Sequence, residues 1–184
     1  LISDLIYQVI TFGEKGGTAL AFTGNAIVVN SCSKYFSVTG WRLGWMILPE
    51  EMLRSAECLA QNLFISPPTL SQHAAVAAFD CRDELDANVA AYAKSRALLL
   101  EELPKAGFDK LAPAEGAFYL YADVTELTND SEAYCRRLLA ETGVATTPGV
   151  DFDPDRGSRY MRFSFAGPFE HMKEAVKRIR AWRA

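Results

Sequence analysis

Apolar positions along the chain form short continuous runs that alternate with longer stretches of helical spacing. Residues 26–30 form one such run, Ala-Ile-Val-Val-Asn, which is typical of a buried strand. Residues 42–48 predict a second strand, because Pro49 ends the pattern there. Leu1-Ile2-Ser3 also has a strand-like start, so we expect the chain to begin inside a strand. These runs predict a sheet with a loop at residues 31–41.

The longer stretches predict helices with recognisable ends. Pro49 and the two acidic residues after it form a typical first turn, and that helix is expected to run towards Leu63. Thr69 is expected to cap a second, alanine-rich helix. From Asp83 onward, apolar residues recur at helical spacing until Pro104, which predicts one long helix. A helix of this length could link two domains.

The remaining segments alternate again between strands and helices. We expect strands at residues 118–122, near Val144 and at 160–165, with helices over residues 131–141 and from Pro168 to the end. This order predicts an α+β module behind the long helix.

Composition and charge narrow the function classes. The 184 residues carry a formal net charge of -4, which leaves no large basic surface for nucleic acid. The four cysteines lack the short spacings of zinc ligands or redox dithiols, so a reduced, cytoplasmic protein is the simplest interpretation. No apolar run reaches bilayer length, and we expect no membrane association. His73 and His171 are far apart in sequence, so neither a metal site nor a catalytic triad is expected.

The loop at residues 31–41 concentrates the candidate chemistry. An amine, Lys34, stands among hydroxyl side chains, with a guanidinium eight residues later. Such an amine can form a Schiff base with a carbonyl. Ser31, Ser33 and Arg42 can hold a phosphate on the same molecule. The combination predicts a phosphorylated aldehyde as cofactor.

The full run at residues 31–45, SCSKYFSVTGWRLGW, resembles the lysine signature of pyridoxal-phosphate-dependent aminotransferases of fold type I, class I/II. The resemblance implies that Lys34 forms the Schiff base with pyridoxal phosphate. It also implies that Ser31 and Arg42 bind the cofactor phosphate and that Ser33 lies beside it. The alternative is that Lys34 and Arg42 are solvated loop charges, which fifteen matching positions disfavour.

Two further residues precede the loop. An acid at the end of a buried strand is a natural ligand site in open α/β sheets, and Asp4 has that place. The segment from Asp4 to Tyr7 resembles the family's Asp-x-x-Tyr element. That resemblance implies a carboxylate at the pyridine nitrogen and a phenol at the ring oxygen of the cofactor. Leu5 departs from the acid that often follows the aspartate, which affects neither contact.

Near the other end, residues 160–165 alternate strictly between two faces. Met161, Phe163 and Phe165 share one face, so Arg162 is directed away from the core of its module. The segment resembles the family's late Arg-x-Ser element, whose arginine binds the α-carboxylate of the substrate. The alternative is an arginine on the exposed face of an edge strand.

The resemblance covers essentially the whole chain and implies its architecture. We expect an α/β fold: the C-terminal part of a large cofactor domain with a mostly parallel sheet over residues 1–83, then an interdomain helix and a small α+β domain over 84–184. The family also implies a homodimer. Because the chain begins without methionine, we expect an upstream segment, and the resemblance implies that this segment completes the cofactor site. The chain by itself is expected to have weak or no activity.

The implied reaction moves an amino group from an α-amino acid to a 2-oxo acid, with Lys34 as the catalytic base. Two other interpretations stay open from the sequence. A carbon-sulfur lyase or an aminocyclopropane-forming synthase of the same fold would use the same lysine. An aminotransferase-like effector domain of a transcription regulator would bind the same ligands without turnover. The identity of the side chain on the substrate is not encoded in these motifs.

Overall fold

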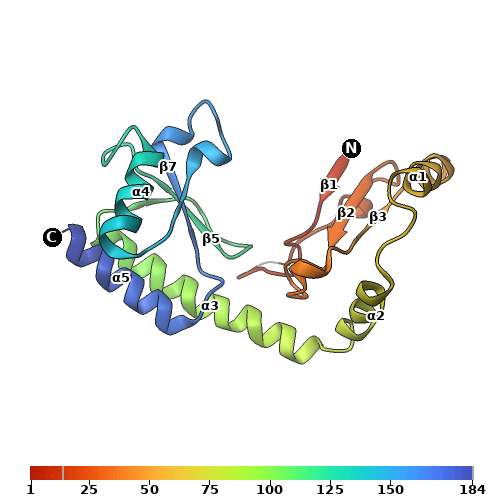
Figure 1. Ribbon diagram of the computed structural model, residues 1–184, viewed down its shortest axis with the longest axis horizontal. Helices are drawn as coiled ribbons and strands as arrows, with labels where there is room; N and C mark the ends of the chain where they lie inside the picture. Colours follow the sequence, from red (N-terminus) through yellow and green to blue (C-terminus); the bar gives the residue numbers. More distant parts are fainter. Residues whose placement is uncertain (14, 184) are drawn as a thin grey trace. The chain divides into compact units, whose positions relative to one another are not determined.

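The computed structural model describes residues 1–13 and 15–183, which divide into two compact units, Leu1–Val89 and Ala90–Ala184 (Figure 1). The boundary between the units falls within the long helix α3, Arg82–Lys105. Each unit has its own sheet. The alternation of strands and helices expected from the sequence is therefore confirmed, and the chain has an α/β fold.

The first unit contains a three-stranded sheet in the order β1-β2-β3. Its strands are β1 (Ile2–Asp4), β2 (Ile27–Ser31) and β3 (Gly44–Ile47). β1 and β2 are parallel, whereas β2 and β3 are antiparallel. The expectation of a mostly parallel sheet is wrong for these strands. A short loop can join antiparallel neighbours at one edge of a sheet, while parallel neighbours need a longer crossover.

The helices of this unit follow the sheet. α1 spans Glu50–Leu63, with Glu50 and Glu51 in its first turn, where carboxylates stabilise the positive end of the helix dipole. α2 spans Thr69–Ala78. Thr69 is wrong as the predicted cap: the helix begins at Thr69 itself, and Pro68 holds the cap position without a side-chain bond. Two short 3-10 helices, Ala19–Ala21 and Thr39–Trp41, complete the unit.

The second unit contains a four-stranded sheet in the order β4-β5-β7-β6, with every neighbouring pair antiparallel. The strand expected near Val144 is β6, Thr147–Pro148, which lies slightly later because its two residues pair with Arg162 and Met161 of β7, Tyr160–Ser164. Two helices, α4 and α5, accompany this sheet. Their bounds and those of the strands are β4 Lys110–Leu111, β5 Tyr119–Asp123, β6 Thr147–Pro148, β7 Tyr160–Ser164, α4 Ser131–Thr142 and α5 Phe169–Arg183.

The core of the second unit confirms the alternation along β7. Met161 and Phe165 are completely buried and Phe163 is nearly so. Val176 and Ile179 of α5 are buried as well, so this helix has an apolar face and a charged face. Burial of such apolar area is the main source of stability for the unit.

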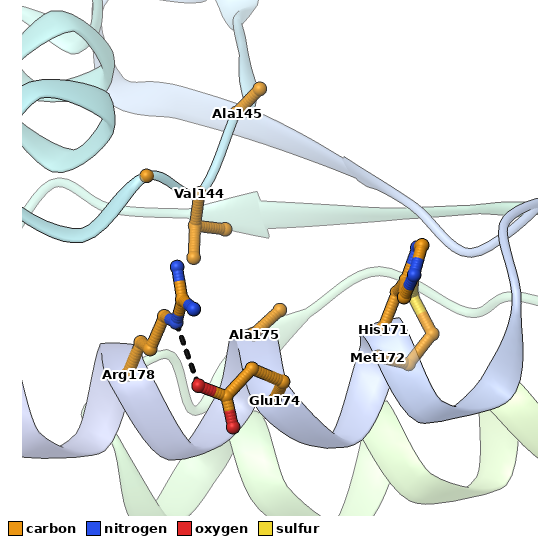
Figure 2. Close-up of a pocket in the computed structure, with 8 residues that line it drawn as sticks. Val144, Ala145, His171, Met172, Glu174, Ala175 and Arg178 are labelled. Carbon is orange, nitrogen blue, oxygen red and sulfur yellow. Dashed lines mark hydrogen bonds and ion pairs between the residues drawn. The ribbon is translucent and has the colours of Figure 1, made fainter.

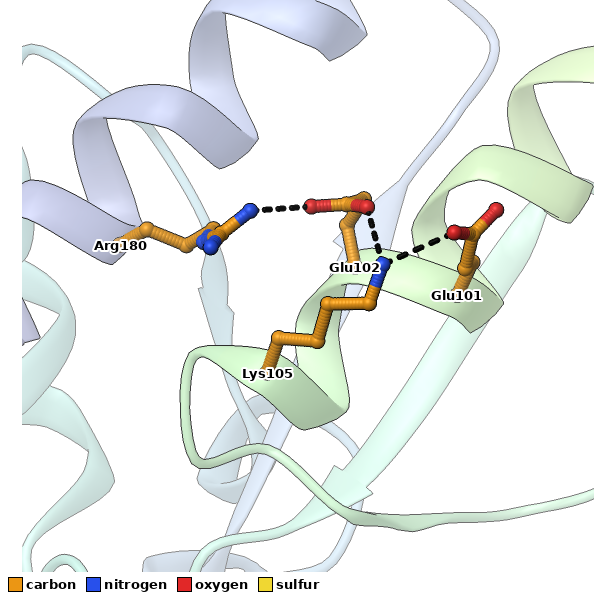
Figure 3. Close-up of polar contacts among 4 residues, drawn as sticks. All are labelled: Glu101, Glu102, Lys105 and Arg180. Carbon is orange, nitrogen blue, oxygen red and sulfur yellow. Dashed lines mark hydrogen bonds and ion pairs between the residues drawn. The ribbon is translucent and has the colours of Figure 1, made fainter.

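Polar contacts connect α5 to α3 within the second unit. Arg180 Nη1 donates to Glu102 Oε2 at 2.8 Å (Figure 3). Lys105 Nζ donates to Glu102 at 2.6 Å and to Glu101 at 2.8 Å. Glu102 is thus the shared acceptor between the two helices.

None of the helices in residues 1–13 and 15–183 has the combined length and apolar character needed to cross a membrane. In the same described part of the chain, no three histidine, cysteine or acidic side chains are grouped as metal ligands would be.

Candidate functional site

The candidate residues of the first unit gather at one edge of its sheet. Because β1 and β2 are parallel, their carboxyl ends lie at the same edge, with Asp4 opposite Val29 and Ser31 two residues further along β2. β3 runs antiparallel and begins at that edge, with Gly44 opposite Ser31. The lysine loop joins β2 to β3 there. The topology therefore brings both ends of the loop and the end of β1 to one place.

Tyr7 and Lys34 are brought together at this edge. Lys34 Nζ lies 5.8 Å from the centroid of the Tyr7 ring, and the lysine is half-buried. Tyr7 lies in a turn that a bond from the Ile10 amide to the Tyr7 carbonyl closes at 2.9 Å. A phenol and an amine this close can contact a single small ring.

Asp4 ends β1 with an exposed carboxylate. Its Oδ1 accepts a hydrogen bond from the amide of Ile6 at 3.0 Å, and this local bond restrains the direction of the carboxylate. Leu5 extends the pairing of β1 with β2 by one bond, since its amide donates to the Val29 carbonyl at 2.9 Å. An accessible anion is therefore held at the end of the parallel pair.

Two hydroxyls are paired at the start of the loop. Ser31 Oγ and Ser33 Oγ are 2.9 Å apart, and the Ser33 amide donates to Ser31 Oγ at 3.0 Å. Thr39 Oγ1 donates to the Ser33 carbonyl at 2.7 Å and ties the loop back on itself. Hydroxyls paired in this way can donate to phosphate oxygens.

Arg42 leads into β3 from a left-handed backbone conformation, with φ of 53°. A residue other than glycine adopts this region at an energetic cost of about 1 kcal/mol or more. Its Nη1 donates to the Thr39 carbonyl at 3.0 Å, and the side chain is exposed. Gly44 is required next, because a Cβ there would lie 2.7 Å from the Asn30 carbonyl oxygen. The loop thus presents the Arg42 guanidinium just before β3, whose first residue, Gly44, pairs with Ser31.

Two neighbours of Lys34 have raised pKa values. Burial raises the pKa of the Cys32 thiol, which favours the protonated form, so this cysteine has the character of a packing residue. Burial and a hydrogen bond to Asp86 raise the pKa of Tyr35 to about 12. Tyr35 Oη donates to Asp86 Oδ1 at 2.6 Å. The residue after Lys34 is thereby attached to the first turns of α3.

Arg162 lies in the second unit, in the middle of β7. It is half-buried, and its neighbours on adjacent strands are Tyr121 and Thr147. Its Cζ lies 4.2 Å from the ring centroids of both Tyr119 and Phe152. The sequence indicated that Arg162 leaves the core face, but it did not indicate the two rings. The Tyr119 contact could have been found from strand pairing, whereas the Phe152 contact comes from an irregular segment.

A separate surface pocket of about 340 Å³ lies where α4 ends, against α5 (Figure 2). Arg178 projects into it, but this guanidinium already donates to Glu174 at 2.8 Å and to the Thr142 carbonyl at 3.1 Å. A cation at the C-terminus of a helix satisfies the helix dipole and its last carbonyl groups. Arg178 is therefore a structural cap for α4. His171 also borders the pocket and is exposed.

The chain is similar to known proteins along nearly its whole length. The model of the family "Aminotransferase class I and II" matches residues 1–179. The valine–pyruvate aminotransferase of Mycobacterium tuberculosis is 50% identical over 99% of this chain and 48% of its own length. A (5-formylfuran-3-yl)methyl phosphate transaminase of Methanocaldococcus jannaschii is 36% identical over 98% of this chain and 49% of its own length.

A solved structure of an aminotransferase from Mycobacterium tuberculosis matches with a TM-score of 0.94 and 49% identity, over 98% of this chain and 48% of that one. The chain thus spans about half the length of the curated relatives it matches. The chain belongs to the class I and II aminotransferases, a family that depends on pyridoxal phosphate.

Proposed function

We propose that the full-length protein is a pyridoxal-phosphate-dependent aminotransferase that moves an amino group from an α-amino acid to a 2-oxo acid. The observation that supports this proposal most strongly is the convergence of Asp4, Tyr7, Ser31 and Lys34 at one edge of the first sheet. Residues 1–83 are assigned to the large cofactor domain, and residues 84–184 to the interdomain helix and small domain.

The side chains present suit the chemical groups of the cofactor. The paired hydroxyls of Ser31 and Ser33, with the exposed guanidinium of Arg42, form a donor set for a phosphate dianion. The carboxylate of Asp4 suits a protonated pyridine nitrogen, and the phenol of Tyr7 suits a ring oxygen. Bound pyridoxal phosphate supplies an electron sink for the negative charge left when the substrate loses its α-proton.

Lys34 has two roles in this proposal. Its Nζ would hold pyridoxal phosphate covalently through the aldehyde carbon. The same Nζ would act as the base that accepts the α-proton of the substrate and later returns a proton. Arg162 binds the α-carboxylate with a two-pronged contact, which orients the α-carbon and its proton.

The substrate class is proposed from the family and its relatives. One of the relatives named above is a valine–pyruvate aminotransferase at 50% identity, so valine and other amino donors with an uncharged side chain are the first to test. We further propose a cytoplasmic homodimer, with no nucleic acid or membrane among its partners. The dimer and the location stay predictions.

Replacement of Lys34 tests the proposal in the full-length protein. Lys34→Ala should abolish both the near-visible absorbance of the bound cofactor and the exchange of amino groups between valine and pyruvate. Lys15→Ala, outside the lysine loop, is the matched control and should leave both intact. Turnover by K34A at the wild-type rate would refute the assignment. Release of ammonia and a 2-oxo acid by the wild-type protein, without an exchanged amino acid, would instead indicate a lyase.

A further inference from the structure

Two aromatic rings pack against the Arg162 guanidinium within the second unit. The Cζ atom lies 4.2 Å from the ring centroid of Tyr119 and 4.2 Å from that of Phe152. An aromatic face attracts a cation placed over it, and the attraction grows where water is excluded. The rings therefore hold the guanidinium in place without neutralising its charge.

Hydrogen bonds contribute little to this placement. Among the residues that the structure describes, the buried Nε of Arg162 has no hydrogen-bond partner. Nη2 lies 3.5 Å from Thr147 Oγ1, at the outer limit of a hydrogen bond. A half-buried cation with unsatisfied donors has a strong preference for an anionic partner. The donor capacity of Arg162 is thus kept for a ligand.

The backbone explains why each ring lies beside the cation. Tyr121 pairs with Arg162 across β5 and β7, so Tyr119 is the diagonal neighbour on the same face of the sheet. Phe152 directly follows the 3-10 helix Gly149–Asp151, and its amide donates to the Gly149 carbonyl at 2.9 Å. One ring is placed by strand register and the other by a tight turn.

The turn that carries Phe152 is itself fixed by close backbone packing. A Cβ on Gly149 would lie 2.5 Å from the Gly157 carbonyl oxygen, so only glycine permits this approach. The same Gly157 carbonyl accepts a hydrogen bond from the buried hydroxyl of Ser131 at 2.9 Å. The ring of Phe152 is 49% exposed, although its backbone is held firmly. An exposed aromatic side chain on a rigid turn has little value for core packing.

We propose that Phe152, together with Tyr119, is a positioning residue that orients the Arg162 guanidinium towards the carboxylate of the amino acid substrate. The inference rests on the proposed function and adds two residues to it. The rings restrain the rotation of a long side chain before the substrate arrives. A cation held in advance loses less entropy on binding, so the rings favour carboxylate-bearing ligands.

The experiment compares Phe152→Leu with Phe152→Tyr in the full-length, cofactor-loaded protein. F152L keeps an apolar side chain of similar size but removes the aromatic face, whereas F152Y retains the face. The probes are valine as amino donor and 3-methylbutanoate, an unreactive carboxylate of the same carbon skeleton, whose binding is measured by calorimetry. Thermal unfolding of each variant reports on any structural effect.

We expect F152L to weaken 3-methylbutanoate binding by about tenfold, the scale of one cation–π contact with a desolvated cation. The KM for valine should rise by a similar factor while kcat stays within about twofold, because the contact acts on ground and transition states alike. F152Y should behave as the wild type. An F152L protein with unchanged carboxylate binding, or with a lowered kcat and an unchanged KM, would overturn the positioning role.

Two further outcomes separate the positioning role of Phe152 from the carboxylate role of Arg162 in the proposed function. If the wild-type protein exchanges amino groups and binds 3-methylbutanoate but F152L does so equally well, only the positioning role is wrong. If Arg162→Gln binds 3-methylbutanoate as the wild type does, the carboxylate role of Arg162 is wrong, and the positioning role falls with it.

Discussion

The hydroxyl of Tyr35 donates a hydrogen bond of 2.6 Å to Asp86, across 51 positions of the sequence. Tyr35 is the residue after Lys34, and Asp86 lies in the first turns of α3. Arg82 is also 3.6 Å from the Asp86 carboxylate and balances its charge. The lysine loop is therefore restrained by the same helix that continues into the second unit.

Removal of this bond should lower the free energy of unfolding, and the effects of changing Tyr35 and Asp86 should not be additive. Tyr35→Phe is expected to lower the free energy of unfolding by about 1 kcal/mol, the usual net contribution of a hydrogen bond. Asp86→Asn should have a smaller effect, because an amide oxygen still accepts the bond, whereas Asp86→Ala removes the acceptor. Urea unfolding of the wild type, Y35F, D86A and the double variant checks the coupling. Strict additivity of the two single effects would show that the residues do not interact.

The raised pKa of Tyr35 predicts a dependence of stability on alkaline pH. The folded protein holds this phenol protonated to a pKa of about 12, against an ordinary value of 10.0. The contribution to stability is therefore fully present below pH 10 and is lost as the pH rises towards 12. The difference in unfolding free energy between wild type and Y35F should shrink over this range. A difference that stays constant from pH 9 to 12 would contradict the assignment.

The close packing under Phe152 predicts intolerance of a single methyl group. Gly149→Ala would place a Cβ 2.5 Å from the Gly157 carbonyl oxygen and 2.7 Å from Tyr160 Cβ. Overpacking of this kind costs about 1–3 kcal/mol of stability. Gly24→Ala is the matched control, since a Cβ at that position meets no atom within 4 Å. Thermal unfolding should show a lower midpoint for G149A alone, and equal midpoints for the two variants would argue against the packing.

Local sequence signals predicted the elements whose ends are set by their own residues. The first helix follows Pro49 and has two acids in its first turn, and its bounds Glu50–Leu63 agree with the prediction. The alternation along residues 160–165 likewise predicted which side chains of β7 are buried. In both cases the physical cause, a helix dipole or a two-residue period, acts within one segment.

Features that depend on a distant partner were not predictable in the same way. The two residues of β6 are a strand only because they pair with β7, so the strand expected near Val144 lies slightly later in the chain. β3 is antiparallel to β2 because the lysine loop reverses the direction of the chain, and the spacing of apolar residues does not predict that reversal. The loop itself was found from its chemistry, but its bond from Tyr35 to Asp86 required the folded chain.

The cluster that joins α3 to α5 predicts a dependence of stability on acidic pH (Figure 3). The hydrogen bond from Lys105, followed by that from Arg180, holds the pKa of the Glu102 carboxyl below its ordinary value of 4.5. A depressed pKa contributes stability above the ordinary value, and this contribution is lost as the pH falls through the pKa of the folded state. Glu102→Gln removes the ionisable group and leaves the side chain the same size.

The difference in unfolding free energy between wild type and E102Q should therefore be largest near neutral pH and should decline below about pH 4.5, the ordinary pKa of a glutamate. Glu101→Gln is the control, because Glu101 is 69% exposed and contacts Lys105 alone in the same cluster. Its effect should be smaller, as expected for an exposed ion pair. Urea unfolding at pH 3.5, 5 and 7 separates the two variants. If E101Q and E102Q lost the same stability at every pH, Glu102 would not be the link between the helices, and the pairing of α5 with α3 would rest on apolar contacts.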